Sequence, residues 1–305
     1  MNEIEKNILN KVAGISDTPQ GAYNIRFNAS SIGRASSENI AILPKGDNKG
    51  IEIHVKPGAK GETVYIPVVL SQSGLKDMVL NDFFIGENSD VLIIAGCGIH
   101  NDGHELAQHD GIHTFFIGKN AHVRYEEKHY GEGAGTGQKI LNPVTELYLE
   151  EGSSMEMDTI QIKGVDSTKR ITKAVVGDRA SIKVTEKLMT HGIQRAETEF
   201  AIELNGAGSG ANIISRSVAK GKSVQIFLSK IDGNNRCTGH SECDAIIMDE
   251  AVVRAIPEIT ASSVDASLIH EAAIGKIAGE QIVKLMTLGL TQEEAEAQIV
   301  NGFLK

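Results

Sequence analysis

The amino-acid sequence predicts a mainly β protein whose strands stack into a β-solenoid, with a short N-terminal segment and a C-terminal helical domain. From about residue 50 to 255, apolar and polar residues alternate in short runs separated by Gly, Asn or Asp, as in half-buried strands. A loose repeat of Gly, two variable residues, a mostly small residue and one variable residue precedes an apolar residue at Val91, Val123, Met157, Ile182 and Ile213. One such ribbon cannot cover its own apolar face, so the repeats are expected to stack on one another.

The composition fits a narrow core, since the chain has 32 Gly but only 8 Phe, 5 Tyr and no Trp. An antiparallel sandwich or barrel is the alternative fold, because its strands are also short and because the intervals between the repeats are unequal.

Residues 1–50 are predicted to form a helix followed by a polar segment, because Ile4, Ile8, Leu9 and Val12 recur at helical spacing. The strand Ile51–Val55 is the first clear one, and the β-helix core is expected to cover residues 51–258.

Residues 259–305 are predicted to form a helical tail that docks a partner. One helix is expected from His270 to Leu288, and Thr291 with Glu294 forms a capping box that opens a second helix. An apolar stripe on the two helices exceeds what they can cover for themselves, so part of it is expected to face a partner. The stripe consists of Ile282, Leu285, Met286, Ile299 and Phe303.

Charge and hydropathy exclude several classes of function. The chain has 30 Lys and Arg against 40 Asp and Glu, a net charge of −10, so a broad basic surface for nucleic acid or an anionic membrane is not expected. No apolar run is long enough to cross a bilayer, and the first residues lack the apolar centre of a signal peptide, so we expect a soluble, cytoplasmic protein. No complete P-loop, zinc-protease or nucleophile-elbow motif is present, which argues against an enzyme.

Two clusters of residues could bind a metal. The first holds Cys97, His100, His104, His109 and His113. Thiolate and imidazole together suit zinc, copper or iron, although histidines on a β surface are often only solvated.

The second cluster lies where the β region meets the tail and holds Cys237, His240, Cys243, His270 and Glu271. The spacing of the two cysteines fits no closed zinc finger, so the cluster could hold labile iron or an iron–sulfur species, or could be a pair of buried thiols beside a helix N-terminus. Cys243 is expected at a turn, with a nearby imidazolium that lowers its pKa.

The C-terminal motifs resemble those of the SufB/SufD family, the scaffold proteins of the SUF iron–sulfur assembly system. The resemblance covers approximately residues 80 to 305 and is closer to SufB. It is carried by the segments Asn235 to Met248, with Glu-Cys-Asp at its centre, His270 to Ile277, Gly279 to Gln281 and Val300 to Phe303.

The resemblance implies a right-handed parallel β-helix with a C-terminal helical domain and a transient iron–sulfur cluster built on a buried cysteine. It also implies a SufC-like ABC ATPase bound through the terminal helices, a sulfur donor and apo iron–sulfur recipient proteins. Cys243 matches the family's scaffold cysteine, and His270 and Glu271 match the His-Glu of its Glu-His-Glu-Ala motif.

The chain departs from the family pattern in three respects. Ile269 stands where the family has the first Glu of that motif, whereas Cys237, His240 and the Cys97 cluster are not family features. Most of the usual N-terminal domain is also missing, which suggests a minimal SufB-like protein working as a homodimer.

Two enzyme classes remain as alternatives. A β-helix enzyme acting on polyanionic carbohydrate could use Asp244, Asp249 and Glu250, often with calcium, although such enzymes are usually exported. A zinc-dependent enzyme could instead use the cluster from His100 to His113.

Overall fold

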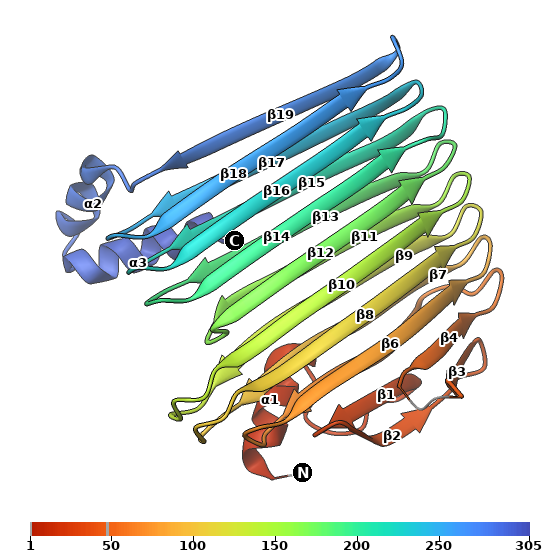
Figure 1. Cartoon of the computed structure of the whole chain (residues 1–305), viewed down its shortest axis with the longest axis horizontal. Helices are drawn as coiled ribbons and strands as arrows, with labels where there is room; N and C mark the ends of the chain where they lie inside the picture. The colour runs from red at the N-terminus through yellow and green to blue at the C-terminus, as the bar shows by residue number, and fades with distance from the viewer. Residues whose placement is uncertain (1, 47–48) are drawn as a thin grey trace.

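The computed structural model describes residues 2–46 and 49–305 and shows a two-sheet β-solenoid with helices at both ends (Figure 1). Each coil of the chain adds one strand to each of two facing sheets. The first, ten-stranded sheet is sheet A. In spatial order it consists of β19 (Ala266–Gly275), β17 (Cys237–Ile247), β15 (Ser209–Ala219), β13 (Ser181–Thr190), β11 (Ser154–Lys163), β9 (His122–Glu132), β7 (Asp90–His100), β5 (Glu62–Leu70), β1 (Ala22–Phe27) and β2 (Ser30–Ala35).

The second, nine-stranded sheet is sheet B. It consists of β18 (Val252–Ala261), β16 (Val224–Gly233), β14 (Arg195–Leu204), β12 (Ser167–Val176), β10 (Lys139–Leu149), β8 (Ala107–Ile117), β6 (Lys76–Ile85), β4 (Ile51–Val55) and β3 (Ile40–Pro44). From β4 and β5 onward every pairing within a sheet is parallel, which confirms the predicted solenoid and rules out the antiparallel sandwich or barrel. The pairs β1–β2 and β3–β4 are antiparallel and form the N-terminal end of the stack.

Strict alternation along each strand points every second side chain between the sheets. Apolar side chains from successive coils stack there into one continuous core, as where Phe83 and Phe115 lie with ring centroids 4.1 Å apart. Two of the predicted repeats were aligned wrongly. Val123 pairs with Met155 rather than Met157, and Ile182 pairs with Ala211 rather than Ile213. Because each alignment was shifted by two residues along the strand, the residues predicted to point inward still do so.

The N-terminal helix α1 (Glu3–Ala13) lies against the outer face of sheet A, where Ile8, Leu9 and Val12 are buried. Two glycines of β7 permit the close approach. A Cβ at Gly96 would lie 2.5 Å from the Val12 carbonyl oxygen, and one at Gly98 would lie 2.0 Å from Ile8 Cγ2. The helix was predicted, but the polar segment after it was not recognised as strands β1 to β3.

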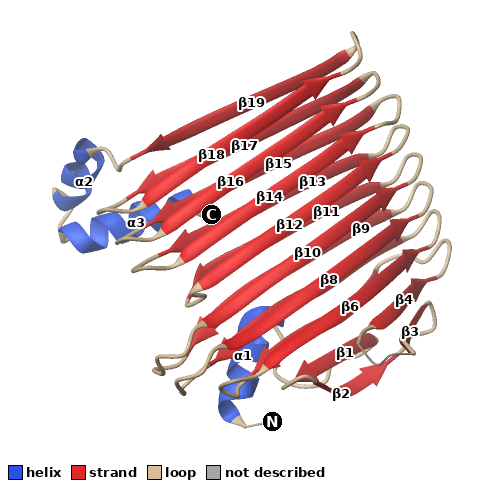
Figure 2. Cartoon of the chain, viewed as in Figure 1, coloured by secondary structure: helices blue, strands red, loops and turns tan. Residues whose placement is uncertain are grey.

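The C-terminal segment differs from its prediction more clearly (Figure 2). The expected helix from His270 was wrong, because residues 266–275 form β19, which pairs in register with β17. Helix α2 (Gly279–Met286) follows, and α3 (Gln292–Phe303) begins with the predicted capping box of Thr291 and Glu294. Val300 and Leu304 anchor α3 on Val218 of β15, so the tail does pack on the body.

The solenoid ends on β18 and β19, and no helix or strand in the described part of the chain covers this end. Their inward faces are largely exposed, and so are several large apolar side chains, namely Val252, Ile256, Ile259, Ile269 and Ile274. We call this end, formed by β18 and β19, the open end. Within the described residues, no helix has the length and apolar character needed to span a membrane.

Candidate metal centre

The predicted ligands of the second cluster all lie on β17 and β19, but on two different faces of sheet A. In the register of these strands Ser241 faces His270, Glu242 faces Glu271 and Cys243 faces Ala272. Alternation then sends Cys243 and His270 between the sheets and His240 and Glu271 to the outer surface. The cluster is therefore divided into an inner pair and an outer pair.

Glu242 completes the outer group, which we call the outer triad: His240, Glu242 and Glu271. One ligand atom from each of these residues lies within 4.8 Å of the others. His240 Nε2 is 3.3 Å from Glu271 Oε2, while its Nδ1 is 3.2 Å from Asn212 Oδ1. An imidazole with two carboxylates is a donor set that suits Fe²⁺ and related divalent ions.

Glu242 was not predicted as a ligand, although it is the Glu of the Glu-Cys-Asp segment that carries the family resemblance. The signal that could have identified it is its separation of two residues from His240, which puts both on one face of a strand. Burial raises the pKa of Glu242, and its hydrogen bond to Asp244 raises it further. Because the negative charges of Glu242 and Asp244 repel each other, a cation bound beside them would be stabilised.

The inner pair lies under the open end. Cys243 is fully buried in the middle of β17, between Ser215 of β15 and Ala272 of β19, so the expected turn at this position was wrong. His270 is its diagonal neighbour on β19, at about 8 Å between Cα atoms from standard strand spacings. The Nδ1 atom of His270 is buried and has no hydrogen-bond partner among the described residues.

The electrostatics of the inner pair also differ from the prediction. Burial raises the pKa of the Cys243 thiol to about 12, and the charges of Glu186 and Asp244 add to the rise. Burial and the nearby His240 lower the pKa of His270, so it is a neutral imidazole at neutral pH. The expected imidazolium that activates the thiol is thus absent. The thiol is protonated until a metal displaces its proton.

Cys237 shares the inward face of β17 with Cys243 but not its site. The two residues are six positions apart, which is about 20 Å along an extended strand. Cys237 packs in the apolar core beside Gly233, where a Cβ would lie 3.0 Å from its Sγ. The structure therefore places Cys237 with the core and away from the other ligands.

Comparison with known proteins agrees with this architecture. The family model described as the SufBD core domain of SUF-system FeS cluster assembly matches residues 80–303, from β6 to the end of α3. The chain belongs to the SufBD core family.

Several curated relatives of this SufBD core are archaeal and carry the name "Iron-sulfur cluster assembly SufBD family protein". The one from Archaeoglobus fulgidus is 31% identical over 260 residues, which cover 85% of this chain and 69% of that protein. The one from Methanothermobacter thermautotrophicus (strain Delta H) is 28% identical over 267 residues, covering 85% of this chain but only 63% of its own length. The relative from Methanocaldococcus jannaschii is 26% identical, with 83% of this chain and 80% of that protein covered.

The first predicted cluster is also divided by the fold of the SufBD core. Cys97 of β7 and His109 and His113 of β8 point between the sheets. His100 and His104 lie outside this interior group. His100 Nε2 is 2.8 Å from Asp102 Oδ2, and His104 Nδ1 is 2.9 Å from Thr136 Oγ1.

A buried ion network lies inside the solenoid between Cys97 and Cys243, and sequence analysis did not detect it. The Arg170 guanidinium donates a hydrogen bond to Glu127, and its Nε lies 3.8 Å from Glu186 Oε1. Glu186 also accepts hydrogen bonds from Thr198 Oγ1 at 2.8 Å and Ser215 Oγ at 2.7 Å. The network places charge in the interior of the core, and only β15 lies between Glu186 of β13 and Cys243 of β17.

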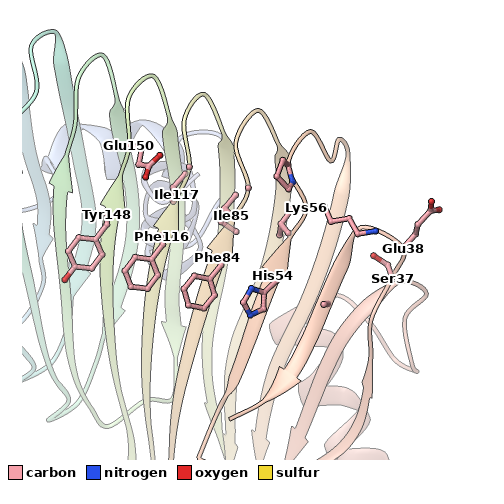
Figure 3. A pocket seen from close by; sticks show the side chains of 15 residues that line it. Ser37, Glu38, His54, Lys56, Phe84, Ile85, Phe116, Ile117, Tyr148 and Glu150 are labelled. Carbon is pink, nitrogen blue, oxygen red and sulfur yellow. The ribbon is translucent and has the colours of Figure 1, made fainter. Parts of the chain in front are cut away.

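The cleft drawn in Figure 3 lies near the other end of the SufBD core, on the outer face of sheet B. His54, Phe84, Phe116 and Tyr148 stack along it from successive strands, with centroid separations of 4.7, 5.2 and 5.3 Å. Because the rings cover one another's faces, the ladder stabilises neighbouring coils. None of the predicted ligands lines this cleft.

Proposed function

We propose that this chain is a scaffold on which an iron–sulfur cluster is assembled at the open end, with the cluster as cargo to be passed on. The observation that carries the proposal is the meeting of two donor sets on β17 and β19. A thiol and a neutral imidazole lie inside sheet A, and the outer triad lies on its surface. Membership of the SufBD core family supports a role in iron–sulfur cluster assembly.

The two donor sets suit different steps of assembly. The carboxylates and imidazole of the outer triad suit Fe²⁺ as it arrives, whereas the Cys243 thiolate suits iron that already carries sulfide. Cys243 is covered by β19, so sulfide and iron reach it only when the open end moves. We assign that movement to a SufC-like ABC ATPase, in which ATP hydrolysis would reside, so the chain itself needs no catalytic group.

Reconstitution with Fe²⁺ and sulfide under anaerobic conditions tests the role of the outer triad. Glu242→Gln and Glu271→Gln should each lower the affinity for iron by about tenfold, because each removes one charged ligand. Glu258→Gln on β18 is the matched control, since Glu258 is exposed at the same end and pairs with Lys230 instead. Stoichiometric calcium or zinc without acid-labile sulfide would instead support one of the two enzyme alternatives.

We further propose that two copies of the chain pair through the open end. Its exposed apolar side chains and unpaired strand edges favour addition of another strand. β18 carries Pro257, which has no amide hydrogen, whereas β19 has no proline, so β19 is the better edge for pairing. Pairing there would bring two copies of Cys243, His270 and Glu271 close together.

Sedimentation should therefore give twice the 32.7 kDa chain mass at micromolar concentration. Ile259→Asp on the exposed inward face of β18 should shift the protein to monomer, because it would bury a charge in the interface. Ile193→Asp, at an exposed turn in the middle of the solenoid, should leave the dimer intact. A wild-type chain that sediments only as a monomer would contradict the pairing.

We propose that the ATPase binds mainly to α2. The predicted apolar stripe included residues of both C-terminal helices. In the structure, however, Phe303 packs beside Val218 against the solenoid, and Ile299 is half-buried. Helix α2 has no buried residue, and Val283 is 60% exposed beside the exposed Met286. Leu288, in the turn that follows α2, is 76% exposed. An apolar surface of this kind on a short helix suits a groove on a partner.

The double variant Val283→Asp with Leu288→Asp should abolish co-purification with the ATPase, because it places two charges in the contact. Point changes are preferable to deletion of residues 290–305, which would also uncover Val218. Ile4→Asp on the exposed side of α1 is the control and should bind normally. Unchanged binding by the double variant would move the docking site elsewhere.

A further inference from the structure

A second group of metal-type donors surrounds a small cavity inside the solenoid, far from the outer triad. The cavity has a volume of about 10 Å³, close to the minimum that admits one water molecule. Its lining includes Cys97, His109, His113, His129 and Gly111, which come from β7, β8 and β9. All five are buried between the sheets, so they form a closed compartment.

The ring orientation of His109 leaves one nitrogen for the cavity. Its Nδ1 is 3.0 Å from Asp77 Oδ2, and Asp77 is in turn held by Arg26 at 2.9 Å. Its Nε2 is buried and has no hydrogen-bond partner among the described residues. A histidine that donates Nδ1–H to a carboxylate and presents Nε2 has the arrangement usual for a metal ligand.

Gly111 accounts for the space between the two histidines of β8. A Cβ at this position would lie 3.4 Å from His109 Nε2 and 3.1 Å from His113 Nε2. The two ring nitrogens therefore border the volume that a side chain at 111 would occupy. Gly111 lies within β8 and does not have a positive φ, so its backbone conformation does not require glycine. The absence of a side chain at this position leaves the cavity open.

Cys97 faces this volume from the opposite sheet, with His129 beside it in register. His129 Nδ1 is 3.2 Å from Gln161 Oε1, and its Nε2 is 3.6 Å from Glu127 Oε1.

We propose that Cys97, His109 and His113, with His129 beside them, bind a single thiophilic transition-metal ion of the Zn²⁺ or Fe²⁺ type. One thiolate and several imidazoles are the donors that such ions prefer, and a small closed compartment suits tetrahedral ligation. Hard ions such as Mg²⁺ and Ca²⁺ are disfavoured, because the carboxylate at the cavity, Glu127, is already engaged by Arg170. The site goes beyond the cluster scaffold and does not depend on it.

Co²⁺ is the probe for this site, since a thiolate bound to cobalt gives a charge-transfer absorption in the near ultraviolet. The titration uses the Cys237→Ser, Cys243→Ser chain, in which Cys97 is the only thiol, both on the folded protein and during refolding from urea. We expect one equivalent of Co²⁺ with a thiolate band and tetrahedral d–d bands, and Zn²⁺ should displace it. Absence of a thiolate band under both loading conditions would overturn the proposal.

Two further variants assign the ligands. Gly111→Ala keeps every donor but fills the space between the imidazoles, so Co²⁺ affinity should fall by at least about tenfold. Gly210→Ala in β15 is its control, because the nearest atom to that Cβ would be 3.6 Å away. Cys97→Ser in the otherwise wild-type chain should remove one equivalent of Zn²⁺ while iron–sulfur reconstitution at Cys243 continues. A Gly111→Ala chain that remains folded by circular dichroism and binds Co²⁺ as tightly as its parent would place the ion elsewhere.

Discussion

A Cys243→Ser variant should fold, form the same oligomer and fail to retain an iron–sulfur cluster. Serine fills nearly the volume of cysteine, and its hydroxyl lies next to that of Ser215, whose oxygen can accept a hydrogen bond in the buried site. The alcohol does not replace a thiolate as a ligand for iron. Iron and acid-labile sulfide after anaerobic reconstitution should therefore fall to background.

The raised pKa of Cys243 adds a dependence on pH to the same measurement. With a pKa of about 12, the thiol is protonated in the apo chain, so each iron–thiolate bond formed releases one proton. Loading should consequently improve as the pH rises from 6.5 to 8.5, by up to about tenfold per pH unit. Cys237→Ser is the control, since Cys237 lies about 20 Å away along the strand, and it should load normally. Parental iron and sulfide contents in Cys243→Ser would make Cys243 a purely structural residue.

Arg170→Leu should cause a large loss of stability. Arg170 is 4% exposed and compensates the charges of Glu127 and Glu186, both also buried. Removing one partner of a buried ion pair leaves uncompensated charge and costs about 3–5 kcal/mol, a large part of the free energy of unfolding of an average domain. The midpoint of urea unfolding at pH 7 is the measurement.

The loss should be smaller at lower pH. In the wild-type chain burial opposes ionisation of Glu127, but Arg170 and His129 hold its pKa well below its usual value. That stabilisation is present above the unfolded pKa and is lost as the pH falls. In Arg170→Leu the pKa of Glu127 should be higher than in the wild-type chain, because burial still opposes its ionisation and Arg170 no longer favours it. The carboxyl is then neutralised more readily, so the difference in stability between the two proteins should narrow towards pH 4.5. Arg124→Leu, which breaks an exposed pair with Glu126, should change stability by less than about 1 kcal/mol.

Most of the fold could be predicted, because a solenoid repeats one local rule. Period-two alternation identifies strands without knowledge of their partners, and it did so in the region from β4 to β16. The prediction of strands from this alternation failed where the strand faces are only partly buried. In β19 Ile274 lies three and four residues before Ile277 and Ala278, so it fits a helical stripe that continues beyond the strand. In the polar strand β2 no apolar pattern was present to read.

The candidate site could be predicted in composition but not in geometry. Cys243 and His240 are three residues apart, so once the strand is known they must face opposite sides of it. The error was to expect a turn at Cys243, which removes that constraint. The ion network was out of reach for a different reason, because Arg170 meets Glu127 across 43 residues of chain and no local pattern links them. Ligands from separate coils become neighbours only through the stacking register.

The two ends of the stack are unequal, and this asymmetry limits how the molecule can polymerise. At the N-terminal end the edges are the short strands β2 and β3, which run antiparallel to their neighbours, and β3 ends on Pro44. Such edges are poor templates for another strand, whereas β18 and β19 present ten residues each. Contact between two C-terminal ends would occupy β18 and β19 of both molecules. Only β2 and β3 would then remain as free edges, one pair at each end of the dimer. In the proposed dimer, growth would therefore stop at two chains and would not continue into a fibre.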